Sequence, residues 1–238
     1  MVNTDSFVVE AQQWCLGPSE LSIVPGEVHL WRVDLAVPLL VDEVLAETLS
    51  DQETSRAGGF INNELKRKYA NSHLALRKIL SKYQDCPPHQ LDFSVTKRGK
   101  PYLDNTPLQF NLSHSGELAL VAVAVGGACR IGVDVECVDR QLDVLGLAQR
   151  FFTHNEHQEL QNLTDIDSHK GFFAIWTLKE AFVKATGEGL YASLTDFEVT
   201  LAAGKDGLVC CSAAMGYVSD WNLMRLSLEG GYAGALAV

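Results

Sequence analysis

The sequence of 238 residues predicts an α+β fold. Two long helical patterns, at residues 60–83 and 171–190, are each surrounded by short segments with the alternation and β-branched content of strands. A faint internal similarity links GELALVAVAV at 116–125 with GYAGALAV at 231–238. Two similar α+β halves would explain this similarity. A chance likeness of two strands rich in alanine and valine is the alternative.

The first elements follow local signals in chain order. Residues 27–35 have the β-branched and aromatic content of a strand, and helical periodicity follows over 41–49. Ser50 and Glu53 have the spacing of a capping box, which predicts a helix start. The long helix that follows should stop before Pro87, because proline has no N–H group to donate.

Three further segments complete the first half. Residues 91–95 are expected to form a strand and residues 97–101 a turn. Residues 108–125 are expected to form two strands joined at Ser113–Gly116.

Strict alternation of apolar residues predicts a strand at 130–136 in the second half. Thr153 and Glu156 form a second capping box. The long helix at 171–190 should end at Gly187, where glycine can adopt a left-handed conformation. Further strands are expected at residues 194–200, 207–213, 221–228 and 231–238.

Charge is unevenly distributed along the chain. The formal net charge is −11, which argues against general nucleic-acid binding. Residues 1–55 hold one basic and ten acidic residues, whereas residues 56–100 hold ten basic and three acidic residues. A basic segment in an acidic protein predicts a local anion site. A solvated basic helix face is the alternative.

Cysteine usage and apolar patterns indicate a cytoplasmic protein. The six cysteines are scattered, with no CxxC pair, so we expect buried free thiols. Neighbouring Cys210 and Cys211 would point to opposite faces of a strand, so at least one should point inward. No apolar run approaches the ~18 residues of a membrane helix, and the acidic N-terminal segment lacks the pattern of a signal peptide.

Two acidic residues on the strand at 130–136 are the first candidates for chemistry. Asp134 and Glu136 should point the same way, roughly 6.5–7 Å apart along the strand, with Gly132 leaving room beside them. Carboxylate oxygens with open positions suit Mg²⁺, which keeps water and substrate phosphates as further ligands. Two incidental acids on a solvent-facing strand are the alternative.

Glu180 and Lys184 stand one helical turn apart and therefore share a face of their helix. Either they form a surface ion pair, or Glu180 completes the acidic site while Lys184 meets a phosphate. His114 interrupts two apolar strands, where it either donates to an anion or is an ordinary turn residue. His154 and His157 are a poorer metal candidate, because a capping box accounts for the polar residues around them.

Five motifs occur together in one order. They are Gly-Lys-Pro (99–101), Phe-Asn-Leu-Ser-His-Ser (110–115), Ile-Gly-Val-Asp-Val-Glu (131–136), Arg-Phe-Phe (150–152) and Trp-Thr-Leu-Lys-Glu-Ala-Phe-Val-Lys-Ala-Thr-Gly-Glu-Gly-Leu (176–190). This series resembles the Sfp-type 4′-phosphopantetheinyl transferases, and the likeness runs from about Val28 to the C-terminus.

The resemblance implies the phosphopantetheinyl transferase fold. That fold has two similar α+β halves related by a pseudo-twofold axis, each a small sheet packed with a long helix, and coenzyme A binds in the cleft between them. We therefore expect an N-terminal half at residues 1–128. The C-terminal half, which carries the metal site, is expected at residues 129–238.

The resemblance also assigns site residues. The metal ligands would be Asp134, Glu136 and Glu180. The catalytic residues would be Glu180, as general base directly or through a metal-bound water, and Lys184, which supplies positive charge to a phosphate. The residues that bind coenzyme A would be Arg56 near its 3′-phosphate, Lys68 facing the nucleotide, and Lys100, Ser113, His114 and Lys184 at its phosphates. Three of these lie in the basic segment at 56–100, which favours an anion site there.

The implied reaction is the magnesium-dependent attack of a carrier-protein serine on the β-phosphate of coenzyme A, which releases 3′,5′-ADP. The implied partners are coenzyme A and an acyl or peptidyl carrier protein, with no nucleic acid and no membrane, and the chain is expected to be a monomer. Two other functions stay open: a magnesium-dependent phosphohydrolase, and a non-catalytic protein that holds coenzyme A or a carrier. The sequence also leaves open whether the carrier serves fatty acid, polyketide or nonribosomal peptide synthesis, and whether Mg²⁺ or Mn²⁺ is preferred.

Overall fold

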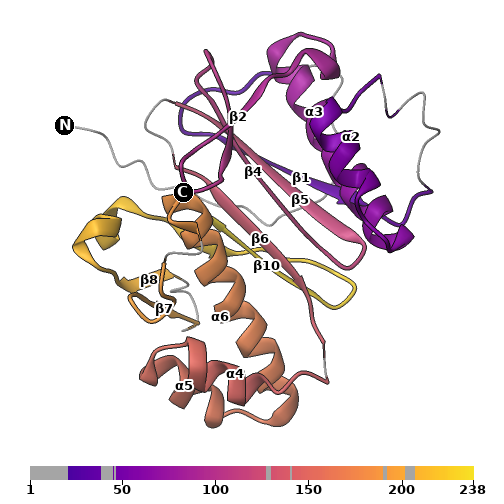
Figure 1. Cartoon of the computed structure of the whole chain (residues 1–238). Helices are drawn as coiled ribbons and strands as arrows, with labels where there is room; N and C mark the ends of the chain where they lie inside the picture. The colour runs from indigo at the N-terminus through magenta and orange to yellow at the C-terminus, as the bar shows by residue number, and fades with distance from the viewer. Residues whose placement is uncertain are drawn as a thin grey trace.

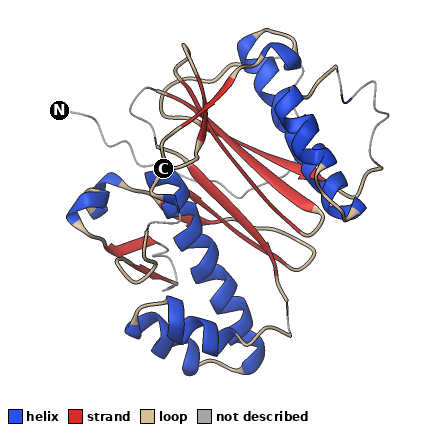
Figure 2. Ribbon diagram, in the orientation of Figure 1, coloured by secondary structure: helices blue, strands red, loops and turns tan. Residues whose placement is uncertain are grey.

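The computed structural model describes residues 21–38, 45, 47–126, 130–139, 141–189, 192–201 and 207–238. Small antiparallel sheets and helices make up an α+β fold (Figures 1 and 2). The fold class predicted from the sequence is therefore confirmed. The helix expected at 41–49 lies partly outside the described residues.

The described elements follow one another closely. The strands are β1 (Val28–Asp34), β2 (Phe93–Val95), β3 (Pro101–Leu103), β4 (Leu108–Ser115), β5 (Leu118–Val125), β6 (Gly132–Cys137), β7 (Glu198–Thr200), β8 (Gly207–Cys210), β9 (Leu223–Arg225) and β10 (Tyr232–Ala237). The helices are α2 (Asp51–Gly58), α3 (Asn63–Gln84), α4 (Val144–Phe151), α5 (His154–Gln161) and α6 (Asp165–Thr186). Short 3₁₀ helices span Pro88–Gln90, Ala213–Met215 and Val218–Asp220.

Two three-stranded antiparallel sheets form the centre of the molecule. One has the strand order β1-β5-β4 and the other the order β6-β10-β9, while β2-β3 and β7-β8 are separate two-stranded pairs. Strands β4 and β6 are edges of their own sheets and lie next to each other (Figure 1). Each larger sheet thus comes from one half of the chain. The division between residues 128 and 129 stays a prediction.

Strand β5 packs on both of its faces, which explains its nearly continuous apolar sequence. Val121 and Val123 belong to a core that also contains apolar residues of α3. Leu120 and Ala122 belong to a second core that they share with β6 and β10 of the other sheet. A third core surrounds α6, which lies along β6 and β10 (Figure 1).

Helix ends follow the predicted capping chemistry. Both capping boxes are present, at Ser50 before α2 and at Thr153 before α5. Helix α6 ends as expected before Gly187, which has φ 74°. It begins earlier than expected, at Asp165, because the Thr164 side chain caps its first turn. The first turn is polar, so apolar periodicity does not mark this start.

The turn between β4 and β5 differs from the prediction. Strand β4 continues through Ser115, and Gly116 makes the turn with φ 56°. His114 is therefore a strand residue and not a turn residue. Successive side chains of β4 point to opposite faces of the strand, so Ser113 and Ser115 share one face and His114 points to the other.

The strands after α6 are shorter than predicted, and the cysteines differ in burial. The four described cysteines are free thiols, but Cys137 and Cys210 are exposed and Cys86 and Cys211 are only partly buried. Cys211 is the inward member of the vicinal pair, since its Sγ donates to the Gly216 carbonyl at 3.3 Å. Among the described helices, none combines the length and apolarity that a membrane span requires.

Candidate active site

Strand β6 and helix α6 meet at Gly132. A Cβ atom on Gly132 would lie 2.0 Å from the Ala181 carbonyl oxygen and 2.5 Å from the Ala185 amide nitrogen. Only glycine permits so close an approach of two backbones. The sequence predicted that Gly132 leaves room beside Asp134 and Glu136, but the α6 backbone occupies this space. The close contact of β6 and α6 also places Lys184 next to Asp134.

Asp134, Lys184 and Ser113 form a compact polar network at this contact. The Lys184 ammonium donates to Asp134 Oδ1 at 2.6 Å and to Ser113 Oγ at 2.8 Å. The Ser113 hydroxyl donates to Asp134 Oδ1 at 2.9 Å. Asp134 is only 3% exposed. A buried carboxylate of this kind needs charged or hydrogen-bonding partners, and the network provides both.

Two further carboxylates, Glu136 of β6 and Glu180 of α6, face the same region. Burial is the main cause that raises the pKa of Glu136; the Asp134 charge raises it further and a hydrogen bond from Ser115 opposes this. Burial also raises the pKa of Glu180, with additional increases from Asp134 and Glu136 and a decrease from Lys184. The three acids are therefore close enough to repel one another electrostatically.

The chemistry of these acids fits a divalent cation. Asp134 Oδ2 is buried and accepts no hydrogen bond in the described part of the chain, so one carboxylate oxygen is left for a hard cation. The geometry is less complete: among the described residues, no three His, Cys, Asp or Glu side chains stand together as a ligand set. Repulsion between like charges opposes such convergence. Metal binding by Asp134, Glu136 and Glu180 stays a prediction.

His114 adds a titratable group on the other side of this region. It is exposed on β4, yet the surrounding protein desolvates it and this lowers its pKa. The charges of His73, Lys184 and Lys68 lower the pKa further. His114 therefore lies within electrostatic reach of the Lys184 and Lys68 ammonium groups.

The two predicted basic residues near α3 have different surroundings. The Arg56 guanidinium lies over the Tyr69 ring, 5.6 Å from its centre. The Lys68 ammonium binds Glu64 at 2.5 Å and Glu117 at 3.3 Å. The hydrogen bond to Glu64 is the main cause that raises the pKa of Lys68. Lys68 is therefore largely neutralised by its own protein partners.

Lys100 lies at the centre of the contact between the two halves. Its ammonium donates to the Ile131 carbonyl at 2.8 Å and to the Lys184 carbonyl at 2.7 Å. It thereby ties the β2–β3 hairpin to the start of β6 and to the last turn of α6. The sequence predicted a phosphate contact here; the structure shows these bonds to the backbone.

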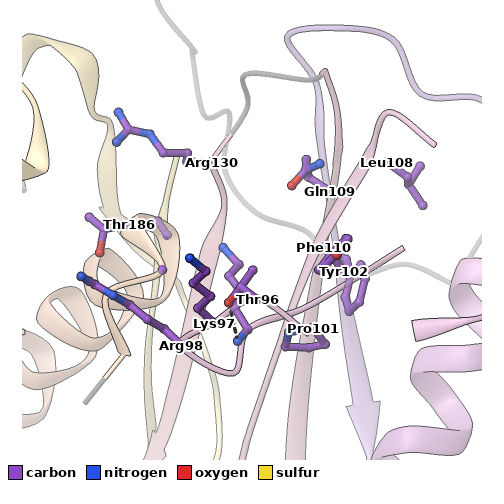
Figure 3. Close-up of a pocket in the computed structure, with 13 residues that line it drawn as sticks. Thr96, Lys97, Arg98, Pro101, Tyr102, Leu108, Gln109, Phe110, Arg130 and Thr186 are labelled. Atoms are coloured by element: carbon purple, nitrogen blue, oxygen red, sulfur yellow. Dashed lines mark hydrogen bonds between the residues drawn. The ribbon is translucent and has the colours of Figure 1, made fainter. Parts of the chain in front are cut away.

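A basic cavity of about 340 Å³ opens next to Lys100 (Figure 3). Its walls are the β2–β3 hairpin, the beginning of β4, Arg130 two residues before β6, and the end of α6. Its basic lining residues are Lys97, Arg98, Lys100 and Arg130. Ala185, Thr186 and Gly187, the three residues that follow Lys184 in the sequence, line it as well.

Two of these basic side chains have fixed positions. Arg98 forms an ion pair with Glu188, which follows α6. The Arg130 guanidinium lies 4.1 Å from the centre of the Trp221 ring. Arg130 and Thr186 of the C-terminal half lie on one side of the view and Leu108 and Gln109 of β4 on the other, with the hairpin between them (Figure 3).

Sequence reasoning did not single out Arg98, Arg130 or Ser115. Arg98 belongs to the basic segment that was recognised, but its pairing with Glu188 depends on the fold. Arg130 gave no signal, because it meets the cavity only through tertiary structure. Ser115 had a usable signal: two residues after Ser113 in a strand, it must share the face that carries the network.

Comparisons with known proteins identify the family of this chain. A family profile described as the 4′-phosphopantetheinyl transferase superfamily matches residues 130–237, and one for the N-terminal part of 4′-phosphopantetheinyl transferase matches residues 42–126. The 4′-phosphopantetheinyl transferase HetI of Nostoc sp. is 37% identical over 94% of this chain and 93% of its own length. The 4′-phosphopantetheinyl transferase Sfp of Bacillus subtilis is 30% identical over 64% of this chain and 72% of its own.

Among solved structures, the holo-[acyl-carrier-protein] synthase of Thermotoga maritima aligns with a TM-score of 0.38 and 25% identity, covering 46% of this chain and 61% of its own. The sequence matches by themselves define the protein as a transferase. The chain belongs to the 4′-phosphopantetheinyl transferase superfamily, and the resemblance to its Sfp-type members is confirmed.

Proposed function

We propose that this protein moves 4′-phosphopantetheine from coenzyme A to a serine of an acyl or peptidyl carrier protein, with Mg²⁺, in the cytoplasm. The observation that carries the proposal is the adjacency of two sites. The acidic network around Asp134 suits a cation. The basic cavity, which is lined by the end of α6 and by Lys100, whose ammonium donates to the Lys184 carbonyl, suits a nucleotide phosphate. A diphosphate that spans both would have its bridging oxygen near Lys184.

The residues of this chain divide into three tasks in the proposed complex. Lys184 and His114 donate to the diphosphate, and Arg56 binds the 3′-phosphate. Ser113 donates to the diphosphate when its hydroxyl turns away from Asp134 Oδ1, to which it donates in this structure. Lys68 and Lys100 add positive potential and hold the walls of the site, because protein oxygen atoms already bind their ammonium groups. Mg²⁺ held by Asp134, Glu136 and Glu180 would offset the charge that develops on the diphosphate.

The transfer step exchanges one P–O bond for another. The carrier serine Oγ forms a bond to the β-phosphorus of coenzyme A, and the bond from that phosphorus to the bridging oxygen breaks. 3′,5′-ADP leaves with that oxygen and with the electron pair of the broken bond. The serine proton passes to Glu180, directly or through a metal-bound water. Burial raises the pKa of this carboxyl in the absence of metal, whereas a bound cation would lower it.

Mass spectrometry of a purified apo carrier protein tests this function. Incubation with this protein, coenzyme A and Mg²⁺ should add one phosphopantetheine group to the carrier serine and release 3′,5′-ADP. Release of phosphopantetheine in the absence of carrier would instead identify a phosphohydrolase. Binding of coenzyme A without any adduct on several carriers would identify a non-catalytic binding protein.

A further inference from the structure

Strands β4 and β6 are joined by side chains. Alternate side chains of β4 each accept a hydrogen bond from a backbone amide of β6, and we call these three bonds the rungs. Their pairs and N···O distances are Asn111 with Val133 (2.8 Å), Ser113 with Val135 (3.4 Å) and Ser115 with Cys137 (3.1 Å). The junction therefore runs in register along both strands, two residues per rung.

Two of the three rungs also hold a carboxylate. The Ser113 hydroxyl donates to Asp134 Oδ1 at 2.9 Å, and the Ser115 hydroxyl donates to Glu136 Oε2 at 2.8 Å. Each hydroxyl thus gives its proton to a carboxylate and accepts from the amide of the next residue of β6. The Asn111 rung has no carboxylate, because the equivalent position of β6 is Gly132.

The Glu136 side chain is freer to move than that of Asp134, so the hydrogen bond from Ser115 matters for its position. Unlike Asp134, Glu136 has a longer side chain and is only partly buried. Asp134 and Glu180 both repel it, so without a donor it would turn toward solvent. The Ser115 hydroxyl donates directly to the Glu136 carboxylate. A side-chain hydrogen bond from Trp176 of α6 lowers the pKa of Glu136 by less than the one from Ser115 does.

We propose that Ser115 is a positioning residue, whose hydroxyl orients the Glu136 carboxylate toward Asp134 and thereby sets the affinity of the site for a divalent cation. The proposal rests on the proposed function in one respect, that Glu136 is a metal ligand. Groups that orient a metal ligand typically change metal affinity by ~10- to 100-fold when they are removed. Because Trp176 stays in place, we expect an effect near tenfold.

Titration with Mn²⁺, followed by electron paramagnetic resonance of the free ion, measures this affinity in the full chain. The dissociation constant for Mn²⁺ should rise about tenfold in Ser115→Ala and stay within about threefold of wild type in Ser115→Thr, which keeps the hydroxyl. In the transfer assay, Ser115→Ala should need more Mg²⁺ for half-maximal rate, while the rate at saturating Mg²⁺ changes less. Thermal unfolding of each variant shows that it is folded.

Two control variants separate positioning from a loosened junction. Asn111→Ala removes a rung without releasing a carboxylate, and Ser81→Ala removes a hydroxyl that bonds only the Lys78 carbonyl of α3. Both should bind Mn²⁺ like wild type. Wild-type affinity in Ser115→Ala, or an equal loss in Asn111→Ala, would overturn the positioning role alone. If the wild-type protein bound no Mn²⁺ with or without coenzyme A, the proposed function and the positioning role would both be contradicted.

Discussion

A single carboxylate group carries two roles in this site through its two oxygen atoms. Asp134 Oδ1 accepts from both Lys184 and Ser113, which offsets the cost of burying the charge. Asp134 Oδ2 is left without a hydrogen bond among the described residues. One oxygen thus anchors the side chain in the fold, and the other is left for a ligand.

Asp134→Asn should therefore abolish most activity without unfolding the protein. The amide keeps the shape and can still accept from Ser113, but it removes the negative charge that a cation needs. Loss of several kcal/mol of charge stabilisation corresponds to a fall of about 10³-fold in kcat, measured by carrier mass spectrometry. The control is Asp92→Asn, an exposed acid before β2. Near-normal transfer by Asp134→Asn at saturating Mg²⁺ would contradict the metal assignment.

His73 makes stability depend on pH. Burial is the main cause that lowers its pKa, and burial also lowers that of His114. Below the ordinary pKa of about 6.5, the unfolded chain therefore binds protons that the folded chain does not. The free energy of unfolding should fall as the pH drops below this value, whereas above it the two histidines contribute no pH dependence.

Urea unfolding at pH 5.5 and pH 7.5 tests this effect of His73. His73→Gln removes the titration while keeping a side chain that can donate to the Tyr69 carbonyl, as His73 Nδ1 does at 2.9 Å. The variant should lose less stability than wild type between the two pH values. An identical loss in both proteins would show that His73 does not contribute.

At the residue level, sequence reasoning found charges but not their partners. The period of two in β6 placed Asp134 and Glu136 on one face, and helical spacing placed Glu180 with Lys184. Nothing local indicated that Lys100 would bind two backbone carbonyls, or that Lys68 would bind Glu117. Such partners come from elements that are distant in sequence, so they depend on the tertiary fold.

At the level of elements, the position of α6 is set from two sides. Gly132 lets β6 touch the α6 backbone. On the opposite side, Lys179 and Glu156 form an ion pair in which the two side chains are 0% and 1% exposed. Lys179 also donates to the carbonyls of Leu194 and Phe197. Neighbouring residues 179 and 180 of one motif therefore act differently, one fixing the helix in the core and the other facing the site.

Gly132→Ala should disturb both stability and activity, because the added Cβ would overlap the Ala181 carbonyl of α6. Overpacking of this kind typically lowers the free energy of unfolding by ~1–3 kcal/mol. Displacement of α6 should also separate Lys184 from Asp134 and slow the transfer. The matched control is Gly207→Ala in β8, where nothing lies within 4 Å of the added Cβ. Urea unfolding would contradict this account if both variants had the same stability.

Element boundaries were predictable where side-chain capping or glycine marks them. The starts of α2 and α5 and the end of α6 have such marks. The end of β4 was misplaced although Gly116 marks the turn, because Ser113 and His114 are polar in a strand that is otherwise apolar. Their polarity reflects the junction with β6 and the site, so a local turn rule misplaced the turn.

At the level of the whole molecule, one core belongs to both larger sheets. Apolar residues of β5 pack with those of β6 and β10, and the rungs join β4 to β6. The two halves should therefore unfold together, in a single calorimetric transition with equal calorimetric and van't Hoff enthalpies. Variants that keep only Trp31 in β1 or only Trp176 in α6, of the four tryptophans, provide a fluorescence probe for each half. Two separable transitions would contradict this coupling.

The sequence predicted the class of fold because helical and strand periodicities are local properties. It did not predict that two separate sheets meet edge to edge, since that depends on long-range packing between β4 and β6. A faint internal similarity of the sequence and the resemblance to a known family both pointed to two halves. The position of the basic cavity between them is visible only in the assembled chain.

The serine and asparagine side chains along β4 have one more consequence. Unpaired backbone groups on an edge strand can recruit strands from other molecules and start aggregation. Here two edges face each other, and polar side chains take the place of a partner strand at amides of β6. The seam that aligns the reactive groups thus also protects the protein from adding foreign strands.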